Sequence, residues 1–499
     1  MRKIALWTLS ILFLLLIFTA CGNGQNEISV DPEELAAELP ASEVEVDPDA
    51  GCTHEWALTA FVTEETDISF AGVFTCAKCD KEETRSFSYT DIKIPLVSLD
   101  GDIFGISKNN KVNVHITFES EDYTSFESSA TLKLQGKSSL DYEKSNYSVN
   151  LLDEETGKKK SLEVAEGWGS GSKYVLKANY TDPSYARNIS LSKLYGQVGH
   201  DRGLDDQYES LINCGAIDGF PVLLYLNGKY RGLYNWIMRK DKWIYGMGEE
   251  DKEEAVISGS ETFVFSQENG IFLDDGQGDN VGWEIEYENI KNKEEGWSID
   301  SFNEMLAFVK NADLETFKER ISEYLVVERT IDVIIFNSVF GDVDNVRGNQ
   351  VWCTYDGKRW APVPYDYDRT LGRDGRKLHY YGNDPWSYID NLVYEKVLIA
   401  FEEEIYDRYV SLRKQFFSKD NVISIFKNVM EGLDERFFNA ELRKWQDAVW
   451  RGTDNASDVT SFEKELDYIA DYLDQRLAYC DDLFEALKAG DFPFPSLTA

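Results

Sequence analysis

Hydrophobic and polar residues alternate in several short stretches between residues 91 and 240, a pattern typical of half-buried β-strands. The clearest case is Lys111–Phe118, where an apolar side chain takes every second position from Val112 onward. Asn227 and Gly228 separate two further stretches and predict a tight hairpin turn. The predicted strands are Ile94–Leu99, Lys111–Phe118, Ala130–Leu134, Tyr147–Leu151, Tyr174–Ala178, Phe220–Leu226 and Tyr230–Trp236.

Helical patterns dominate after Ser301, interrupted by an expected strand pair at Gln350–Tyr355 and Arg359–Pro364. An order of strands first and helices later is typical of an α+β fold. We therefore expect a two-lobed domain over residues 91–499, with a β-rich N-terminal part and a helical C-terminal part.

Two segments inside this domain have distinct local signals. A helix is expected over residues 184–198, with Asp182 as its N-cap and Pro183 at its first position. Residues 245–300 are rich in glycine and acidic residues, and we expect them to form a long insertion.

The first residues have the features of a bacterial lipoprotein signal peptide, expected to span residues 1–20. Arg2 and Lys3 precede the apolar run Ile4–Phe18, which has the length of a signal sequence and is short for a membrane-spanning helix. Small residues then precede Cys21, as in a lipobox, so this cysteine is expected to carry a lipid on the extracellular face of the cell membrane. An uncleaved anchor or an ordinary signal peptide is the alternative.

Charge and composition restrict the partners of the mature chain. Residues 21–48 are acidic and poor in large apolar residues, which predicts a tether. The whole chain has 90 acidic and 51 basic residues and a formal net charge of -39, which repels nucleic acid and anionic lipid. We therefore expect no nucleic-acid partner and membrane contact only through the lipid. The acidic surface suits metal ions or basic partners, or simply maintains solubility.

A small module is expected at residues 49–90. Cys76 and Cys79 are spaced to bind one tetrahedral ion from a turn, and Cys52 and His54 project from the same face of an extended segment. Four protein ligands leave no open position, which favours structural zinc over catalysis. A Cys76–Cys79 or Cys52–Cys76 disulfide is the alternative. The module's expected strands are Trp56–Val62 and Ser69–Phe74. Three further cysteines are scattered along the rest of the chain and are expected to be buried thiols, with one disulfide among them as the alternative: Cys214, Cys353 and Cys480.

Acidic and amide side chains form the strongest chemical pattern. Asp344 and Asn349 are five residues apart, and the predicted strand pair that follows leads directly to Asp366 and Asp368. Phosphoryl transfer needs one carboxylate to take the proton of the acceptor hydroxyl, and an amide with a second carboxylate to hold Mg²⁺. A generic acidic loop or a calcium site is the alternative.

Two weaker patterns could contact phosphates. The turn at Gly136, Ser138 and Ser139 could cover phosphates with its backbone N–H groups, and Lys144 could neutralise their charge. Arg187, about one turn into the expected helix, could meet a phosphate or a carboxylate. An ordinary hairpin turn and a surface arginine are the alternatives.

Together and in order, these residues resemble the CotH-type family of spore-coat kinases over residues 94–490. The resemblance implies an atypical protein-kinase-like fold that transfers phosphate from ATP to protein serines with a divalent metal. The sequence departs from the family pattern at Gln135-Gly-Lys137, at Tyr365 and at Met238, where Arg-Gly-Asn, tryptophan and glutamate are usual. The shared motifs are Gly136-x-Ser138-Ser139…Lys144-x-x-Tyr147, Leu176-x-Ala-Asn-Tyr-x-Asp182-Pro-Ser-x-x-Arg187-Asn188, Leu226-Asn-Gly228-x-Tyr-x-Gly232-x-Tyr234, Gly341-x-x-Asp344-x-x-x-x-Asn349 and Pro364-x-Asp366-x-Asp368-x-x-x-Gly372.

The same resemblance assigns roles to individual positions. Asp344 would be the catalytic base, Asn349 and Asp366 would hold Mg²⁺ or Mn²⁺ with Asp368 beside them, and Lys144 would contact phosphates. The module at residues 49–90 resembles small Cys-x-His…Cys-x-x-Cys zinc-ribbon-like modules of bacterial surface proteins. The positions expected to bind the cofactor are Gly136, Ser138, Ser139, Lys144 and Arg187.

Two functions agree with these patterns. The first is a metal-dependent ATP phosphotransferase acting on protein serines or other hydroxyl acceptors at the cell surface or spore coat. Its substrate would be a secreted or surface protein. A basic, serine-rich protein would suit the acidic surface and the expected transfer to serine. The alternative is a non-catalytic surface binding or scaffolding lipoprotein that keeps a kinase-like fold.

The lipid anchor leads to a first prediction. Cys21→Ala should release the protein from the membrane fraction or leave an unprocessed precursor, because the side chain that accepts the lipid is gone. Fractionation and lipid labelling of the variant would measure this. Unchanged lipid labelling would contradict the assignment of Cys21.

Overall fold

The chain forms two compact units, the first ending at residue 89 and the second beginning at residue 90. The predicted signal peptide, Cys21 and the tether lie outside the described residues. No helix in the described part of the chain is long and apolar enough to cross a membrane. The computed structural model describes residues 52–62, 69–79, 81–88, 93–136, 138–249, 251–274, 282–373, 391–433, 437–438, 441, 444–445 and 461–490.

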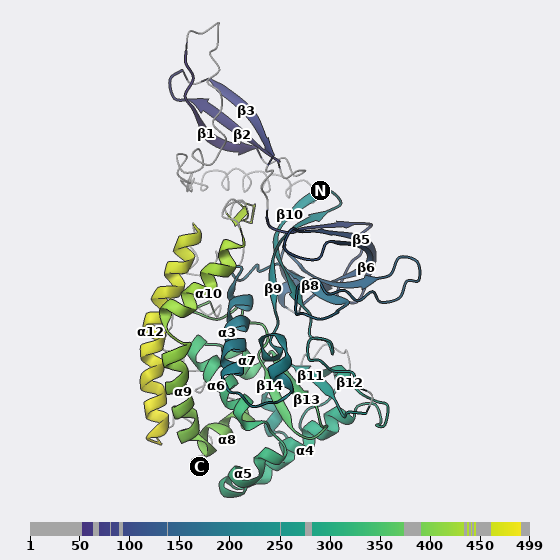
Figure 1. Cartoon of the computed structure of the whole chain (residues 1–499), viewed down its shortest axis with the longest axis vertical. Coiled ribbons are helices and arrows are strands. Elements are labelled where there is room, and N and C mark those ends of the chain that lie inside the picture. Colours follow the sequence, from purple (N-terminus) through teal and green to yellow (C-terminus); the bar gives the residue numbers. More distant parts are fainter. Residues whose placement is uncertain are drawn as a thin grey trace, which may run out of the picture. The chain divides into compact units, whose positions relative to one another are not determined.

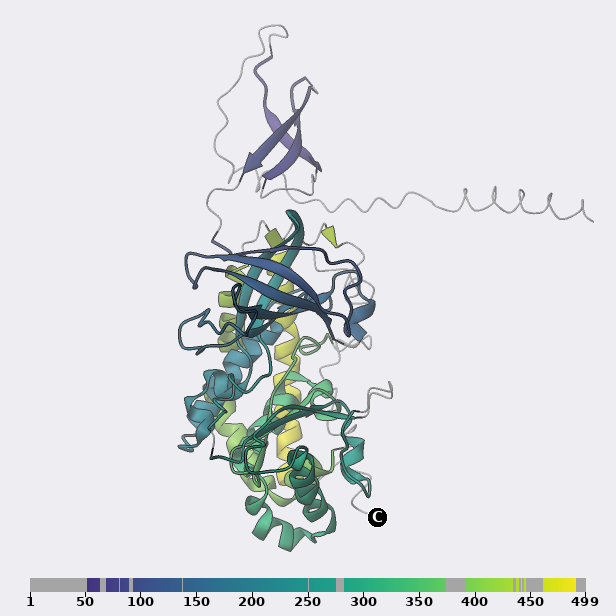
Figure 2. The same cartoon turned by 90° about the vertical axis from the view of Figure 1, so that its right-hand side faces the viewer.

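The first unit is a three-stranded antiparallel sheet in the order β1-β2-β3 (Figure 2). Strands β1 (Trp56–Val62) and β2 (Ser69–Cys76) confirm the two predicted strands, and β3 (Glu82–Ser88) adds a third. A turn over residues 77–79 follows β2. Its first amide, from Ala77, donates to the carbonyl of Glu55, which fixes the turn beside the start of β1.

The second unit begins with a closed seven-stranded barrel in the order β10-β8-β7-β6-β5-β4-β9 (Figure 1). Alternate residues are fully buried, as Val97 and Leu99 on β4 illustrate, because successive side chains of a strand point to opposite faces. Asn227 and Gly228 both have positive φ and form the tight turn between β9 and β10, as predicted. The strands are β4 (Leu96–Asp100), β5 (Val112–Glu119), β6 (Phe126–Gln135), β7 (Asn146–Leu152), β8 (Lys173–Lys177), β9 (Gly219–Leu226) and β10 (Lys229–Met238).

The helix after β8 begins later than predicted. Helix α3 spans Arg187–Asp201 instead of residues 184–198, and Asp182 is not its N-cap. Tyr185 has φ of +55°, so the right-handed helical conformation cannot extend back through it. Asp182 instead accepts hydrogen bonds from the backbone amides of Ser184 and Arg187, which shapes the turn before the helix.

A four-stranded sheet in the order β12-β11-β13-β14 forms the other β-structure of the second unit. Its strands are β11 (Ala255–Gly259), β12 (Trp283–Glu288), β13 (Gln350–Thr354) and β14 (Trp360–Val363). The range expected to form a long insertion, residues 245–300, supplies β11, which pairs directly with β13, and β12 at the edge of this sheet. The strand pair predicted after residue 350 is confirmed as β13 and β14.

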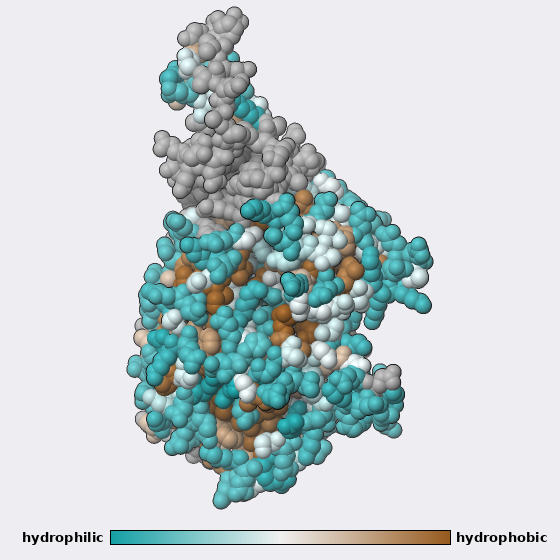
Figure 3. Space-filling view, in the orientation of Figure 1, coloured by the Kyte–Doolittle hydropathy of each residue, from teal (hydrophilic) through white to brown (hydrophobic). Residues whose placement is uncertain are grey.

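Helices complete the second unit and confirm an α+β fold, whereas the closure of the barrel was not predicted. The long helix α12 packs against α9 and α10 (Figure 1). In the orientation of Figure 3 the surface is mostly hydrophilic, with separate hydrophobic areas. The α-helices are α4 (Trp297–Asn311), α5 (Leu314–Arg320), α6 (Val327–Phe340), α7 (Val343–Arg347), α8 (Leu392–Ala400), α9 (Glu402–Gln415), α10 (Lys419–Glu431) and α12 (Phe462–Lys488). The short 3₁₀ helices are η1 (Ser138–Asp141), η2 (Gln207–Ser210), η3 (Ile212–Gly215), η4 (Phe263–Ser266) and η5 (Ile321–Glu323).

Candidate functional site

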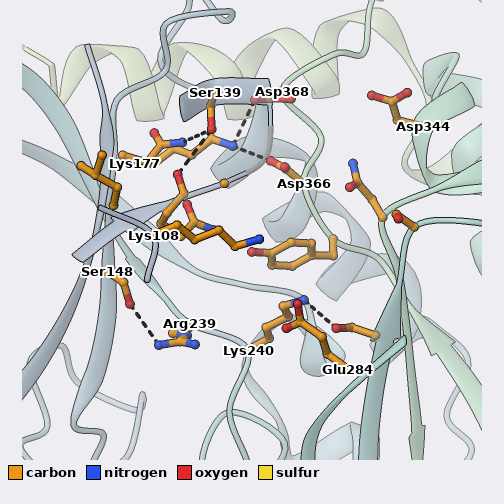
Figure 4. A pocket seen from close by; sticks show the side chains of 18 of the residues that line it. Lys108, Ser139, Ser148, Lys177, Arg239, Lys240, Glu284, Asp344, Asp366 and Asp368 are labelled. Carbon is orange, nitrogen blue, oxygen red and sulfur yellow. Dashed lines mark hydrogen bonds and ion pairs between the residues drawn. The ribbon is translucent and has the colours of Figure 1, made fainter. Parts of the chain in front are cut away.

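A polar pocket of about 370 Å³ lies in the second unit, lined by residues of both the barrel and the four-stranded sheet (Figure 4). The barrel contributes residues of β6, β7 and β8, and the sheet contributes residues of β11, β12 and β13. A volume in this range suits a small molecule or cofactor. The four residues predicted to form the metal and base set all line it, and these are Asp344, Asn349, Asp366 and Asp368.

Two carboxylates share one lysine at the centre of this set. The ammonium of Lys177, at the end of β8, lies 2.6 Å from Oδ1 of Asp366 and 3.0 Å from Oδ2 of Asp368. The three side chains are largely buried, so these charges interact more strongly than they would in water. The sequence signal for Lys177 was weak, because β8 has a lysine at each end of its apolar residues and neither stands out.

The loop after β14 holds Asp366 in an uncommon backbone conformation. Its φ is +67°, in the left-handed region that few non-glycine residues adopt. Asn188, at the start of α3, stabilises this loop at two points. Its Nδ2 donates to Oδ1 of Asp366 at 3.0 Å, and its Oδ1 accepts the amide of Tyr367 at 2.8 Å. Helix α3 therefore positions the carboxylate.

The pKa values of the two carboxylates are shifted in opposite directions. Burial, together with the nearby charge of Asp366, raises the pKa of Asp368 to about 6. Burial alone would also raise the pKa of Asp366, but the charge and hydrogen bond of Lys177 outweigh it, so the pKa of Asp366 is lowered. The closely spaced carboxylates thus need positive charge beside them, which a divalent cation could supply.

Asp344 and Asn349 reach the pocket from another element, helix α7 and the residues that follow it. Oδ2 of Asp344 lies 3.4 Å from Nη1 of Arg369, and both side chains are more than a third exposed. Asn349 has φ of +34°, so it is the second of the four predicted site residues, after Asp366, with a positive φ. The half-exposed carboxylate of Asp344 can meet an acceptor molecule that enters from solvent, which the more buried Asp366 cannot do as readily.

The turn after β6 also lines the pocket. Gly136 has φ of +120°, and a Cβ atom there would lie 1.9 Å from Oγ of Ser139, so only glycine fits. Oγ of Ser139 accepts a hydrogen bond from Nδ2 of Asn146 at 3.3 Å. Gly136 and Ser139 line the pocket, and Ser138 is the first residue of η1.

Lys144 borders the pocket, but its ammonium is directed to protein groups. It forms a buried ion pair with Glu441, and it donates to the carbonyls of Ala178 and Leu233 and to the hydroxyl of Tyr185. Burial lowers the pKa of Lys144 to about 8, although the charge of Glu441 partly offsets this. Four acceptors saturate the ammonium, so its expected contact with phosphates does not match this arrangement, and Lys177 is the better placed cation.

Arg187, unlike Lys144, does not line the pocket. Its fully buried Nη1 lies 2.7 Å from both Asp182 and Glu465, and its Nε donates to the carbonyl of Thr370. Of the two contacts expected for this side chain, the carboxylate contact is the one observed. Arg187 thereby ties helix α3 to α12 and to the loop that carries the site carboxylates.

Met238 ends β10 and is 2% exposed, outside the pocket lining. The two residues that follow it, Arg239 and Lys240, do line the pocket. The family position that usually carries glutamate is therefore an apolar core position here, and the adjacent positions bring positive charge to the pocket.

The first unit contains a separate cluster of ligand atoms from Cys52, His54, Cys76 and Cys79, all within 4.8 Å of one another. Nδ1 of His54 lies 3.3 Å from Sγ of Cys79. Three thiols and one imidazole at this spacing fit a tetrahedral metal ion without an open position. The three cysteines form no disulfide, and Cys214, Cys353 and Cys480 are buried free thiols, as expected.

The profile of the family described as CotH kinase protein matches residues 132–480. This match covers most of the chain and includes Asp344, Asn349, Asp366 and Asp368, so the chain belongs to the CotH kinase family. The comparison with curated proteins found no match. The family membership agrees with the resemblance drawn from the sequence motifs.

Asp342 leads to a pH prediction. Burial, with smaller repulsion from Asp344 and Asp366, raises its pKa to about 8, so the folded protein keeps a proton there that the unfolded chain loses near pH 4. Its contribution to stability is therefore complete below about pH 4 and declines as the pH rises through about 8. Asp342→Asn cannot titrate and should remove this decline.

Thermal unfolding midpoints of wild type and Asp342→Asn at pH 5.5 and pH 8.5 would measure the effect. We expect the variant to lose less stability than wild type between the two pH values. An equal loss in both proteins would contradict a raised pKa at Asp342. Asp356→Asn, at an exposed turn between β13 and β14, is the matched control.

Proposed function

We propose that this protein is a metal-dependent phosphotransferase that moves a phosphoryl group from ATP to a hydroxyl acceptor. The observation that carries the proposal is the pair Asp366 and Asp368, bridged by Lys177, in the same pocket as Asp344 and Asn349. Carboxylate and amide oxygens are the ligands that Mg²⁺ and Mn²⁺ prefer. Membership of the CotH kinase family supports the same reading.

Each side chain has a distinct task in this proposal. Asn349 and Asp366, with Asp368 beside them, would hold the divalent ion, which neutralises phosphate charge when bound. Lys177 would contact the phosphates from the barrel side. Asp344 would orient the acceptor hydroxyl and take its proton. The acceptor oxygen forms a bond to the γ-phosphorus, the bond from that phosphorus to the leaving oxygen breaks, and ADP leaves.

The kinase-like arrangement of two lobes is part of the proposal. The barrel would act as one lobe, and the four-stranded sheet with its helices as the other, because residues from both line the pocket. The acceptor would be a secreted or surface protein. A basic, serine-rich acceptor would be attracted by the net charge of -39 on this chain. The protein itself would be held to the extracellular face of the membrane by lipid on Cys21.

We also propose that Cys52, His54, Cys76 and Cys79 hold a structural Zn²⁺. The compact spacing of the four ligand atoms and the small size of the first unit support this. A unit of this size buries little apolar surface, so metal binding would supply folding free energy.

The catalytic assignment predicts two different losses. Asp366→Ala should abolish metal-dependent binding of ATP by the full chain, because a metal ligand is removed. Asp344→Asn should leave this binding intact but lower turnover by roughly 10²–10⁴-fold, because the base is gone. Calorimetry with Mg²⁺ or Mn²⁺ and a phosphate-transfer assay would measure the two losses.

Asp356→Asn removes one exposed carboxylate outside the pocket and should behave as wild type in both assays. Full turnover in Asp344→Asn would rule out this base. No ATP binding by the wild type with any divalent metal would favour the alternative, a non-catalytic surface scaffold.

The zinc assignment predicts loss of one Zn²⁺ per chain in Cys76→Ser, with unfolding of the first unit and retention of the second. Removal of a buried thiolate leaves three ligands, which cannot close a structural site. Metal analysis of purified protein would measure the zinc content. Cys480→Ser, a buried thiol on α12, is the control and should keep the zinc. Unchanged zinc in Cys76→Ser would disprove the assignment.

A further inference from the structure

The pocket has a second charged region, separate from the carboxylate set. Figure 4 shows Ser148, Arg239 and Glu284 on the opposite side of the pocket from Asp366 and Asp368. Lys133, near the end of β6, lies within electrostatic range of both Arg239 and Lys108, and Lys108 comes from the loop between β4 and β5. We call Lys108, Lys133 and Arg239 the basic cluster.

Two members of the basic cluster are half-buried without a counter-ion. Within the described residues, neither Lys133 nor Arg239 forms an ion pair, although Nη1 of Arg239 donates to Oγ of Ser148 at 3.0 Å. Lys240 in the same region differs, because its ammonium lies 2.7 Å from Glu286. A side chain that only stabilised the fold would be expected to have such a partner.

The charge of the whole chain makes this arrangement more informative. With 90 acidic and 51 basic residues, carboxylates are abundant enough to pair with these cations. Burial and the nearby charges of Arg239 and Lys108 lower the pKa of Lys133, and the charges of Glu284 and Glu286 offset this only in part. A bound anion would relieve this repulsion.

Most of the side chains that line the pocket are polar or charged. Among the described lining residues, Leu134 has the one purely aliphatic side chain, and the aromatic rings belong to Tyr142, Tyr180 and Tyr365. The buried hydroxyl of Ser148 stands beside Arg239 as a further polar group. Arginine, lysine and hydroxyl groups together are the usual partners of phosphate oxygens.

We propose that Lys108, Lys133 and Arg239, with Ser148, form a second anion subsite that binds a phosphate group other than the one at the carboxylate set. The phosphate is either the nucleotide phosphate next to the transferred one or a phosphate on the acceptor. The subsite would give the substrates of the proposed phosphotransferase a second contact, and this role rests on the proposed function. Anion binding here requires no metal.

The test uses the full chain and inorganic tripolyphosphate without divalent metal, measured by calorimetry. Wild type should bind, and the double variant K133Q/R239Q should lose at least about tenfold in affinity, because charge-assisted hydrogen bonds are removed. K158Q removes one exposed lysine outside the pocket and should bind like wild type. Because this assay contains no metal, tripolyphosphate binding reports on the subsite, whereas metal-dependent binding of ATP by the wild type reports on the metal site.

ATP and AMP distinguish the two sources of the phosphate. A loss of affinity for ATP but not for AMP in K133Q/R239Q assigns the subsite to the nucleotide's distal phosphates. Loss of tripolyphosphate binding with both nucleotides unaffected assigns it to the acceptor. Tripolyphosphate binding that is absent in wild type, or that is unchanged in K133Q/R239Q, would overturn the proposal.

Discussion

The contact of Lys177 with Asp366 and Asp368 is the interaction on which the pocket depends. It joins the end of a barrel strand to the loop after β14, two parts of the chain almost 190 residues apart in the sequence. Two carboxylates at this depth would repel each other strongly without a cation, because little water is present to screen them. The barrel therefore cannot shift relative to this loop without exposing unpaired charge.

Two other buried cations tie the second unit together in the same way. Lys144 joins the barrel to Glu441 in the C-terminal region, and Arg187 joins α3 to Glu465 on α12. Burying a charge is costly unless it is paired, and removing one partner of such a pair leaves the other unsatisfied. These contacts make the relative placement of barrel and helices specific. They also explain why two side chains with the chemistry to bind phosphate face protein instead.

Local features of the structure could be predicted from the sequence, and non-local ones could not. Alternation located the barrel strands, and the Asn227-Gly228 turn followed from the backbone freedom of these residues. The spacing of Asp344 and Asp366, together with the resemblance to the CotH-type family, predicted a common site, and both residues line one pocket. Barrel closure and the position of β11 depend on pairing between distant segments, which periodicity does not encode. The same limit applies to Lys177, because one lysine at the end of a strand carries no sign of its distant partners.

The parallel pairing of β4 with β9 closes the barrel, and it joins residues about 127 positions apart. Contacts over such a separation carry a large loop-closure cost and are associated with slow folding. During synthesis, β4 would wait with an unpaired edge until β9 had emerged, and an unpaired strand edge invites pairing with other chains. A chain that crosses a membrane before it folds meets this hazard outside the cytoplasm. The lipid-anchored location proposed here would therefore place a particular demand on factors that protect strand edges at the cell surface.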